Sequence, residues 1–204
     1  VERRGFFSQL NSGLAIFAEQ FDDTWNVTTA TDSDGFISVG SQLETARLLM
    51  EAAASGALNT TQSVHVAAAA QALAVSVVDM ATDDVNGGFM NSLDLASGVR
   101  VSESGKTWWV QTEAIHALWL LYDNSVDERF ARLMESTIKW IEVKQVDLDV
   151  PRSEWLTKVS ADGCDILDGR KGGEWKTPYE IVRSFTTVSS AIGLQVAGQL
   201  ARVR

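Results

Sequence analysis

The sequence predicts an all-α fold in which three pairs of helices stack side by side, with short β-hairpins in the loops between them. Apolar residues recur at helical spacing in six segments. Gly40, Trp108 and Lys176 are separated by 68 residues each time, and each lies where a polar loop leads into a helix. The spans Phe89–Trp109 and Trp155–Trp175 are also equal in length. The alternative is three unrelated helical pairs with coincidental spacing, and the hairpin-then-Trp pattern shared by two of the three units favours repetition. Stacked pairs of this kind form a solenoid or a closed toroid, and a chain of 204 residues suits a single domain, residues 1–204.

The first unit is predicted from periodicity and turn signals. A helix is expected over Glu2–Glu19, because one apolar stripe repeats at a spacing of three or four residues, followed by a polar loop over Asp22–Val39. A second helix should run from Gly40 to Ala53 and end at Ser55-Gly56.

The third helix is predicted over Gln62–Met80, capped by Thr60 or Thr61. It is apolar on nearly all sides and is therefore expected to be tightly packed. Its apolar run, Val64–Val78, is too short for a membrane span.

The other two units repeat the order of loop and helix. A β-hairpin is predicted from Phe89–Leu93 and Val99–Val101, between turn signals. A second hairpin-like segment combines Trp155–Val159, a turn at Asp162-Gly163, and Ile166-Leu167. Three further helices are expected over Trp108–Leu121, Asp127–Val143 and Pro178–Ala201.

Composition limits the possible partners. A formal charge of −10 argues against nucleic acid, whose phosphates require neutralisation by Lys and Arg, and against anionic membrane surfaces. The single cysteine, Cys164, excludes an internal disulfide and a Cys-rich zinc site. No signal peptide is visible, which favours the cytoplasm without fixing the location.

Three loop-to-helix junctions carry the candidate site. Indole faces beside carboxylates and amides suit a carbohydrate, because a pyranose packs its C–H face on an indole while its hydroxyls pair with polar groups. The alternative is that Trp at a helix start is a plug between helices. The substrate-binding candidates are Trp108, Trp109, Gln111, Glu113, Trp175, Lys176, Tyr179 and Arg183.

The catalytic candidates are Glu44 and Glu180. Crowded carboxylates separate in pKa and can then serve as acid and base; alternatively, each is an exposed acid at a helix start. His116, among apolar neighbours, is predicted to be a core histidine. The two distant histidines form no metal cluster, and no phosphate loop is present, so neither a metal nor a cofactor is expected.

Several motifs follow one another along the chain: Gly40–Glu44, Gly87–Phe89, Lys106–Ala114, Leu120–Tyr122 and Gly173–Tyr179. In content and order they resemble the N-acylglucosamine 2-epimerase family, most closely its cellobiose 2-epimerase and mannose isomerase branch. The resemblance implies an (α/α)6 barrel of about twice this length, of which the chain would be the C-terminal half. It also implies chemistry at C2 of an open-chain aldose, which requires groups that exchange protons near neutral pH.

The resemblance also assigns roles to individual positions. Glu44, Trp109, Trp175 and Arg183 match positions that hold the sugar. Two family histidines are replaced, by Ser41 and Glu180. Serine is not a base unaided, and Glu180 could act only if burial raised its pKa. A sugar-binding homologue with impaired activity is therefore expected.

Three alternatives remain open. A carboxylate-driven glycoside hydrolase could use two of Glu44, Glu113, Glu174 and Glu180 facing one cavity. A half-toroid would also expose apolar helix flanks, so two copies could pair as a homodimer that closes a ring. The chain could also be a fragment of a longer protein.

Overall fold

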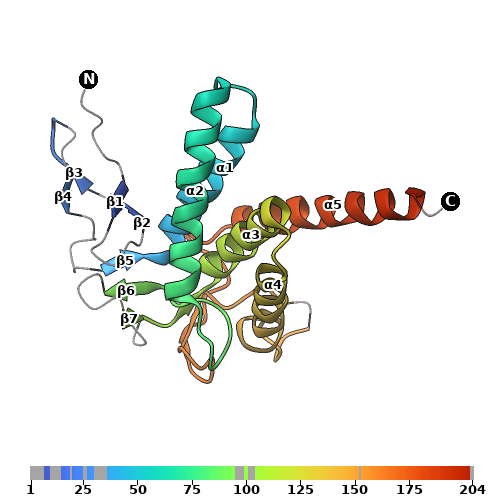
Figure 1. Ribbon diagram of the computed structural model, residues 1–204. Helices are drawn as coiled ribbons and strands as arrows, with labels where there is room; N and C mark the ends of the chain where they lie inside the picture. The colour runs from blue at the N-terminus through green and yellow to red at the C-terminus, as the bar shows by residue number, and fades with distance from the viewer. Residues whose placement is uncertain are drawn as a thin grey trace.

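The computed structural model describes residues 7–9, 15–18, 20–24, 27–29, 36–94, 99–100, 104–151 and 153–202. Helix α3 lies between α1 and α5, while α2 packs mainly on α1 and α4 packs on α3 (Figure 1). Stacked helices are therefore present, although the described residues contain five of the six helices that the three predicted pairs require. The helices within these residues are α1 (Val39–Ala54), α2 (Thr60–Ala81), α3 (Trp108–Ser125), α4 (Glu128–Trp140) and α5 (Tyr179–Arg202).

Short antiparallel strands occupy the loops. Two hairpins near the N-terminus pair β1 with β2 and β3 with β4. Two three-stranded sheets follow, with orders β5-β6-β7 and β10-β9-β8. The strands are β1 (Phe7–Gln9), β2 (Ala15–Phe17), β3 (Gln20–Phe21), β4 (Val27–Thr29), β5 (Phe36–Ser38), β6 (Ser92–Asp94), β7 (Val99–Arg100), β8 (Lys106–Thr107), β9 (Lys158–Val159) and β10 (Ile166–Asp168).

The helix predicted over Glu2–Glu19 is wrong where the structure describes it. Phe7 is opposite Phe17 across an antiparallel pair, and Ile16, in the centre of β2, is fully buried. The apolar residues mimicked a helical period, but Asn11-Ser12-Gly13 between the strands is a strong turn signal. The loop predicted over Asp22–Val39 likewise contains β4 and β5.

The two three-stranded sheets provide the structural basis of the sequence repeat. Strand β5 leads directly into α1 and pairs with the hairpin that precedes α3, with Ile37 opposite Leu93. Strand β8 leads into α3 and pairs with the hairpin that precedes α5, with Lys106 opposite Val159. Both predicted hairpins are thus confirmed, although the first begins at Ser92 rather than Phe89. Each sheet ties the start of one inner helix to the loop before the next.

Helix α2 differs from its prediction in cap and packing. Asn59, not Thr60, caps it through a capping box with Gln62. Its second half is buried, with Leu73 and Val77 in the core, but the side chains of its first half are largely exposed, including Val64 at 62%. Figure 1 shows this half projecting beyond the body beside α1 alone. Tight packing was predicted because a helix that is apolar on all sides is usually buried. Among the described residues, no element packs over one side of the first half of α2.

The length of α2 also corrects an expectation about membranes. At 22 residues, it is long and apolar enough, by length and composition alone, to cross a bilayer. The predicted apolar run was shorter than α2 because it began at Val64 and stopped at Val78. The burial of its second half, including Ala70 and Ala81, ties it to the protein core.

Two apolar clusters share α3. The first joins α1, α2 and α3, and the second joins α3 to α4, α5 and the loop around Leu156. Because α3 contributes to both, twelve of its residues are buried. Helix α4 ends in a π-helical turn, Ile141–Gln145, which carries Ile141 and Gln145 into the second cluster.

Candidate functional site

A chain of ion pairs joins the second turns of α3 and α5 to the third turn of α1. The carboxylate of Glu113 on α3 accepts from Arg47 Nε of α1 at 2.9 Å and from Arg183 Nη2 of α5. Glu113 and Arg47 are buried, with side-chain exposures of 1% and 2%. Two arginines, 66 and 70 residues away from Glu113 in sequence, therefore meet at its buried carboxylate.

Glu44 lies at the open edge of this cluster. Its Oε1 atom is 3.5 Å from Arg47 Nη2 and 3.8 Å from Arg183 Nη1, and its side chain is 39% exposed. Arg47 also donates to both carboxylate oxygens of Glu51, one turn along α1. Glu44 is thus the cluster carboxylate that is loosely held, partly exposed and among the predicted catalytic residues.

The charge state of Glu113 depends on its partners. Burial raises the pKa of this carboxyl group, and the guanidinium groups of Arg47 and Arg183 oppose that rise. The two arginines therefore offset part of the rise in pKa that burial causes.

His116 is a core histidine, as predicted. It is 1% exposed, and its Nε2 lies 3.5 Å from Glu51 Oε1, too poorly aligned to count as a hydrogen bond within the described structure. Burial, reinforced by the positive charge of Arg47, lowers the pKa of His116 to about 4.

This shift predicts a pH dependence of stability. The unfolded chain binds a proton at His116 below its ordinary pKa of 6.5, whereas the folded chain does so only near pH 4. The contribution of neutral His116 to the free energy of unfolding is fully present above pH 6.5 and is lost as the pH falls towards 4. Between pH 7 and 5 the free energy of unfolding should fall by about 2 kcal/mol more in the natural protein than in His116→Leu. Urea unfolding at both pH values measures this difference, and equal losses in the two proteins would contradict it.

Two predicted binding residues of α3 are engaged within the protein. A Cβ atom built on Gly40 would lie 2.2 Å from Cζ3 of Trp109, so this indole packs directly on the start of α1. Gln111 is fully buried; its amide accepts from Phe89 N and donates to Phe89 O, both at 2.8 Å. Both residues hold the start of α3 to its neighbours.

The third junction presents its aromatic residues outward. Trp175 is 81% exposed and Tyr179 is 59% exposed, and Tyr179 stacks under the Arg183 guanidinium at 4.6 Å. Lys176 is buried, with its ammonium 5.4 Å from the ring of Trp108, which is also buried. A pocket of about 350 Å³ lies between Trp108 and the loop that carries Trp175.

The remaining catalytic candidate, Glu180, lies one turn before Arg183 on α5. It is half-buried, and its Oε2 atom is inaccessible and has no hydrogen-bond partner in the described structure. Ser41, on the first turn of α1, donates to Ser38 Oγ at 2.9 Å.

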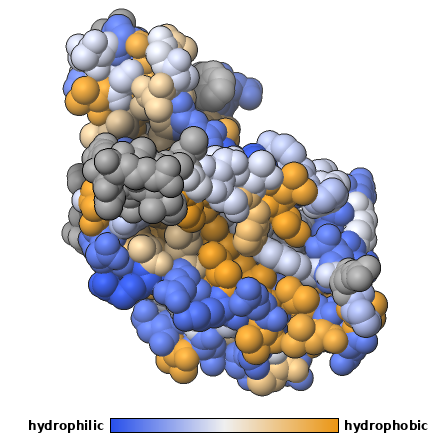
Figure 2. All heavy atoms as spheres, turned by 90° about the vertical axis from the view of Figure 1, so that its right-hand side faces the viewer, coloured by the Kyte–Doolittle hydropathy of each residue, from blue (hydrophilic) through white to orange (hydrophobic). Residues whose placement is uncertain are grey.

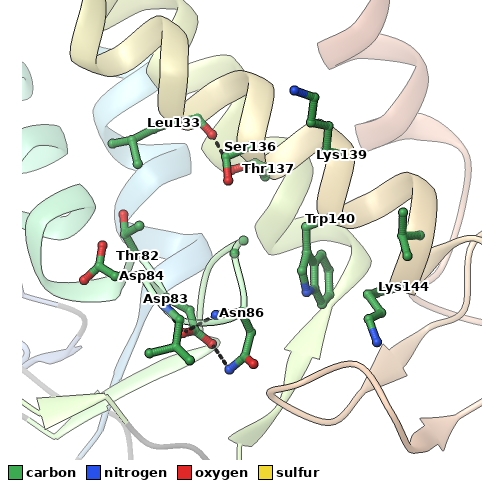
Figure 3. Close-up of a pocket in the computed structure, with 14 residues that line it drawn as sticks. Thr82, Asp83, Asp84, Asn86, Leu133, Ser136, Thr137, Lys139, Trp140 and Lys144 are labelled. Atoms are coloured by element: carbon green, nitrogen blue, oxygen red, sulfur yellow. Dashed lines mark hydrogen bonds between the residues drawn. The ribbon is translucent and has the colours of Figure 1, made fainter.

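A second pocket, of about 490 Å³, lies between the Asp83–Gly88 turn and α4 (Figure 3). Figure 3 shows Asp83 hydrogen-bonded to Asn86 on one side of the pocket. The indole of Trp140 lies on the other side. Lys106 donates to Asp83 at 2.8 Å, and this hydrogen bond lowers the Asp83 pKa to about 2 against the effect of burial. None of the predicted site residues lines this pocket.

Sequence reasoning missed Arg47, the residue that links Glu44 to Glu113. A signal was available, since Glu44, Arg47 and Glu51 follow at i, i+3 and i+7 on an otherwise apolar helix. Such a polar stripe on a buried helix indicates an internal charge cluster.

The stacked helices and the ion pairs that join them define a partial α/α toroid. The model of the N-acylglucosamine 2-epimerase (GlcNAc 2-epimerase) family matches residues 7–182, and the chain belongs to this family. Cellobiose 2-epimerase of Bacteroides fragilis is 27% identical over 182 residues, covering 84% of this chain and 44% of the relative. Cellobiose 2-epimerase of Ruminococcus albus is 32% identical over 75 residues, covering 36% of this chain and 19% of the relative.

Solved structures agree on the fold. The crystal structure of D-mannose isomerase superposes with a TM-score of 0.73 at 21% identity, covering 89% of this chain and 45% of that one. Cellobiose 2-epimerase from Bacillus thermoamylovorans gives a TM-score of 0.69 at 21% identity, covering 83% and 40%. The chain therefore spans less than half the length of these relatives.

Proposed function

We propose that the face formed by the starts of α1, α3 and α5 binds a saccharide, and that the chain converts sugars slowly or not at all. The observation that carries the binding proposal is the meeting of Glu44, Glu113 and Arg183 from three helices, together with the exposed Trp175 on the loop that leads into α5. This combination supplies charged hydrogen-bonding groups and an indole platform, which are the two requirements of a sugar site.

The proposal of impaired turnover rests on Ser41 and Glu180. They stand where the family resemblance places histidines, and neither is a ready proton acceptor and donor near neutral pH. Glu44 and Glu180 remain the candidates for any residual proton transfer, with Trp108, Lys176 and Tyr179 as further contacts, whereas Trp109 and Gln111 hold the start of α3.

Replacing Trp175 with alanine tests the binding proposal. Its ring is exposed and contributes little to the core, so stability should change by less than about 0.5 kcal/mol. Cellobiose affinity should fall about tenfold, because the loss of a stacked indole removes on the order of 1.4 kcal/mol. Isothermal titration calorimetry measures the change.

The matched control is Leu148→Ala, a truncation of another exposed apolar side chain outside the pocket wall. It should leave the affinity unchanged. Equal affinity of Trp175→Ala and the natural protein would mean that the saccharide site lies elsewhere.

The geometry gives less support to a glycoside hydrolase. Such an enzyme needs two carboxyl groups on either side of one sugar bond. Glu113 is buried between two arginines, and Glu174 is exposed beside the pocket of Trp108.

A second candidate function, association with another copy, is favoured by exposed helix flanks. Tyr179, Val182 and Ile192 of α5 are 59%, 58% and 38% exposed. Figure 2 views the side from which α5 projects and shows apolar side chains in a broad band. Contiguous apolar surface of this kind marks association sites.

Sedimentation velocity tests this candidate. If α5 pairs with a second copy, the protein should sediment as a dimer, and Val182→Glu should shift it to a monomer by placing a charge in the contact. A monomer at high concentration in the natural protein would contradict association.

A further inference from the structure

The pocket beneath the loop before α5 has a wall rich in hydrogen-bond donors. Its lining includes Trp108, Arg170, Gly172, Gly173, Trp175 and Lys176. Lys, Arg and Trp side chains donate hydrogen bonds and accept none. The acidic side chain in the lining, Glu174, is exposed to solvent.

The Lys176 ammonium is buried without a full set of acceptors. Its side chain is 5% exposed, yet its hydrogen bond to Lys171 O is long, at 3.4 Å. Glu154 Oε1 is 3.6 Å away and already accepts from Trp155 N at 2.7 Å. An ammonium has three donors, and leaving them unpaired in a buried site is costly.

Trp108 adds a second unmatched donor to the same wall. The residue is 6% exposed, and its indole N–H is inaccessible and meets no acceptor in the part of the chain that the structure describes. Arg170 is the third donor group; Asp168 accepts from its Nε and Nη2 atoms. The wall therefore lacks acceptors rather than donors.

The glycines of the loop keep this space open. A Cβ atom on Gly173 would meet nothing within 4 Å, and one on Gly172 would only approach Lys176 O at 4.0 Å. Neither has a positive φ angle, so neither backbone conformation nor crowding requires glycine here. Both glycines line the pocket, where any side chain would take up room that a ligand could use.

We propose that this pocket receives the carboxylate of an acidic sugar, a uronate, beside the indole of Trp175. The inference rests on the proposed saccharide site and specifies its substrate class. A carboxylate supplies acceptors only, which matches the incompletely paired ammonium of Lys176. Charge-assisted bonds to Lys176 would distinguish the acid from a neutral sugar of the same shape.

Calorimetric titration with cellobiose and with its acid counterpart, β-glucuronosyl-1,4-glucose, tests this inference. At low ionic strength the natural protein should bind the acid roughly tenfold more tightly, as one charge-assisted hydrogen bond provides. Lys176→Met and Lys176→Gln should lose the preference, measured as the ratio of the two affinities, and Lys176→Arg should keep it. Lys171→Met is the matched control, because that lysine pairs with Asp147 outside the pocket wall.

Thermal unfolding of each variant shows whether a lost preference for the acidic sugar reflects a lost fold. Lys176→Met and Lys176→Gln both remove the charge, so both should give the same result. Equal affinity for the two sugars, or a preference that survives in both neutral variants, would overturn the inference and leave the saccharide site standing. If neither sugar binds the natural protein, the proposed function falls together with the inference.

Discussion

Replacing Arg47 with methionine is expected to destabilise the protein by about 3 kcal/mol or more, because removing one partner of a buried ion pair leaves an uncompensated charge. Arg47 is 2% exposed and holds Glu113, which is 1% exposed, at 2.9 Å. Once Arg47 is gone, burial acts on Glu113 with only Arg183 to oppose it, so the carboxyl group should take up a proton more readily. Chemical unfolding at pH 7 measures the loss.

Arg129→Met is the matched control. Arg129 contacts Asp79 at 2.7 Å, but both side chains are more than 40% exposed. An exposed pair contributes less than about 1 kcal/mol, so the control should lose little. The double variant Arg47→Met/Glu113→Gln should be more stable than the sum of the two single losses predicts, because both charges are removed together. A loss below about 1 kcal/mol in Arg47→Met would contradict the role of the cluster.

Replacing Gly40 with alanine should destabilise the protein by about 1–3 kcal/mol, the usual effect of overpacking a well-packed site. The added Cβ atom would lie 2.2 and 2.3 Å from Cζ3 and Cη2 of Trp109, so the indole must move. Thermal unfolding gives the change in stability, and near-UV circular dichroism reports the displaced indole. An unchanged melting temperature and spectrum would show that Trp109 does not pack there.

Gly193→Ala should change the stability of the protein in the opposite direction. Gly193 lies inside α5, and a Cβ atom there would meet nothing within 4 Å. Alanine in a helix interior is favoured over glycine by about 0.5–1 kcal/mol, so this variant should be slightly more stable. The same chemical change therefore separates crowding from helix propensity.

The repeat in the sequence predicted the placement of the inner helices. Gly40 and Trp108 are the second and first residues of α1 and α3, and Lys176 lies three residues before α5. The spacing worked because each 68-residue interval holds two helices and one hairpin, so equal spacing reflects equal architecture. Ion pairs among Glu44, Glu113 and Arg183 then show that the three helix starts meet.

Periodicity failed at the N-terminus for a physical reason. Phe7 and Phe17 fit a helical stripe, but they also lie opposite one another in the β1–β2 pair. A short apolar pattern does not separate these cases, and the turn residues between them decided the outcome. The exposure of the first half of α2, around Val64, could not be predicted from the sequence either, because composition does not reveal which elements will pack against a helix.

Side-chain pairing in the candidate site was only partly predictable. Glu44, Glu113 and Arg183 were chosen from their spacing, and the structure joins them. Gln111 was chosen on the same grounds, yet it bonds to the backbone of Phe89. Whether an amide faces a ligand or its own backbone depends on loop geometry that a sequence pattern does not contain.

The central claim is that the face of α1, α3 and α5 retains saccharide binding while Ser41 and Glu180 leave it without an effective proton-transfer pair. NMR of cellobiose and mannose with the protein in heavy water tests both parts in one sample. The account predicts saturation transfer from protein to sugar, with deuterium entering C2 no faster than in buffer alone. Rapid deuterium incorporation at C2, or the absence of any saturation transfer, would contradict it.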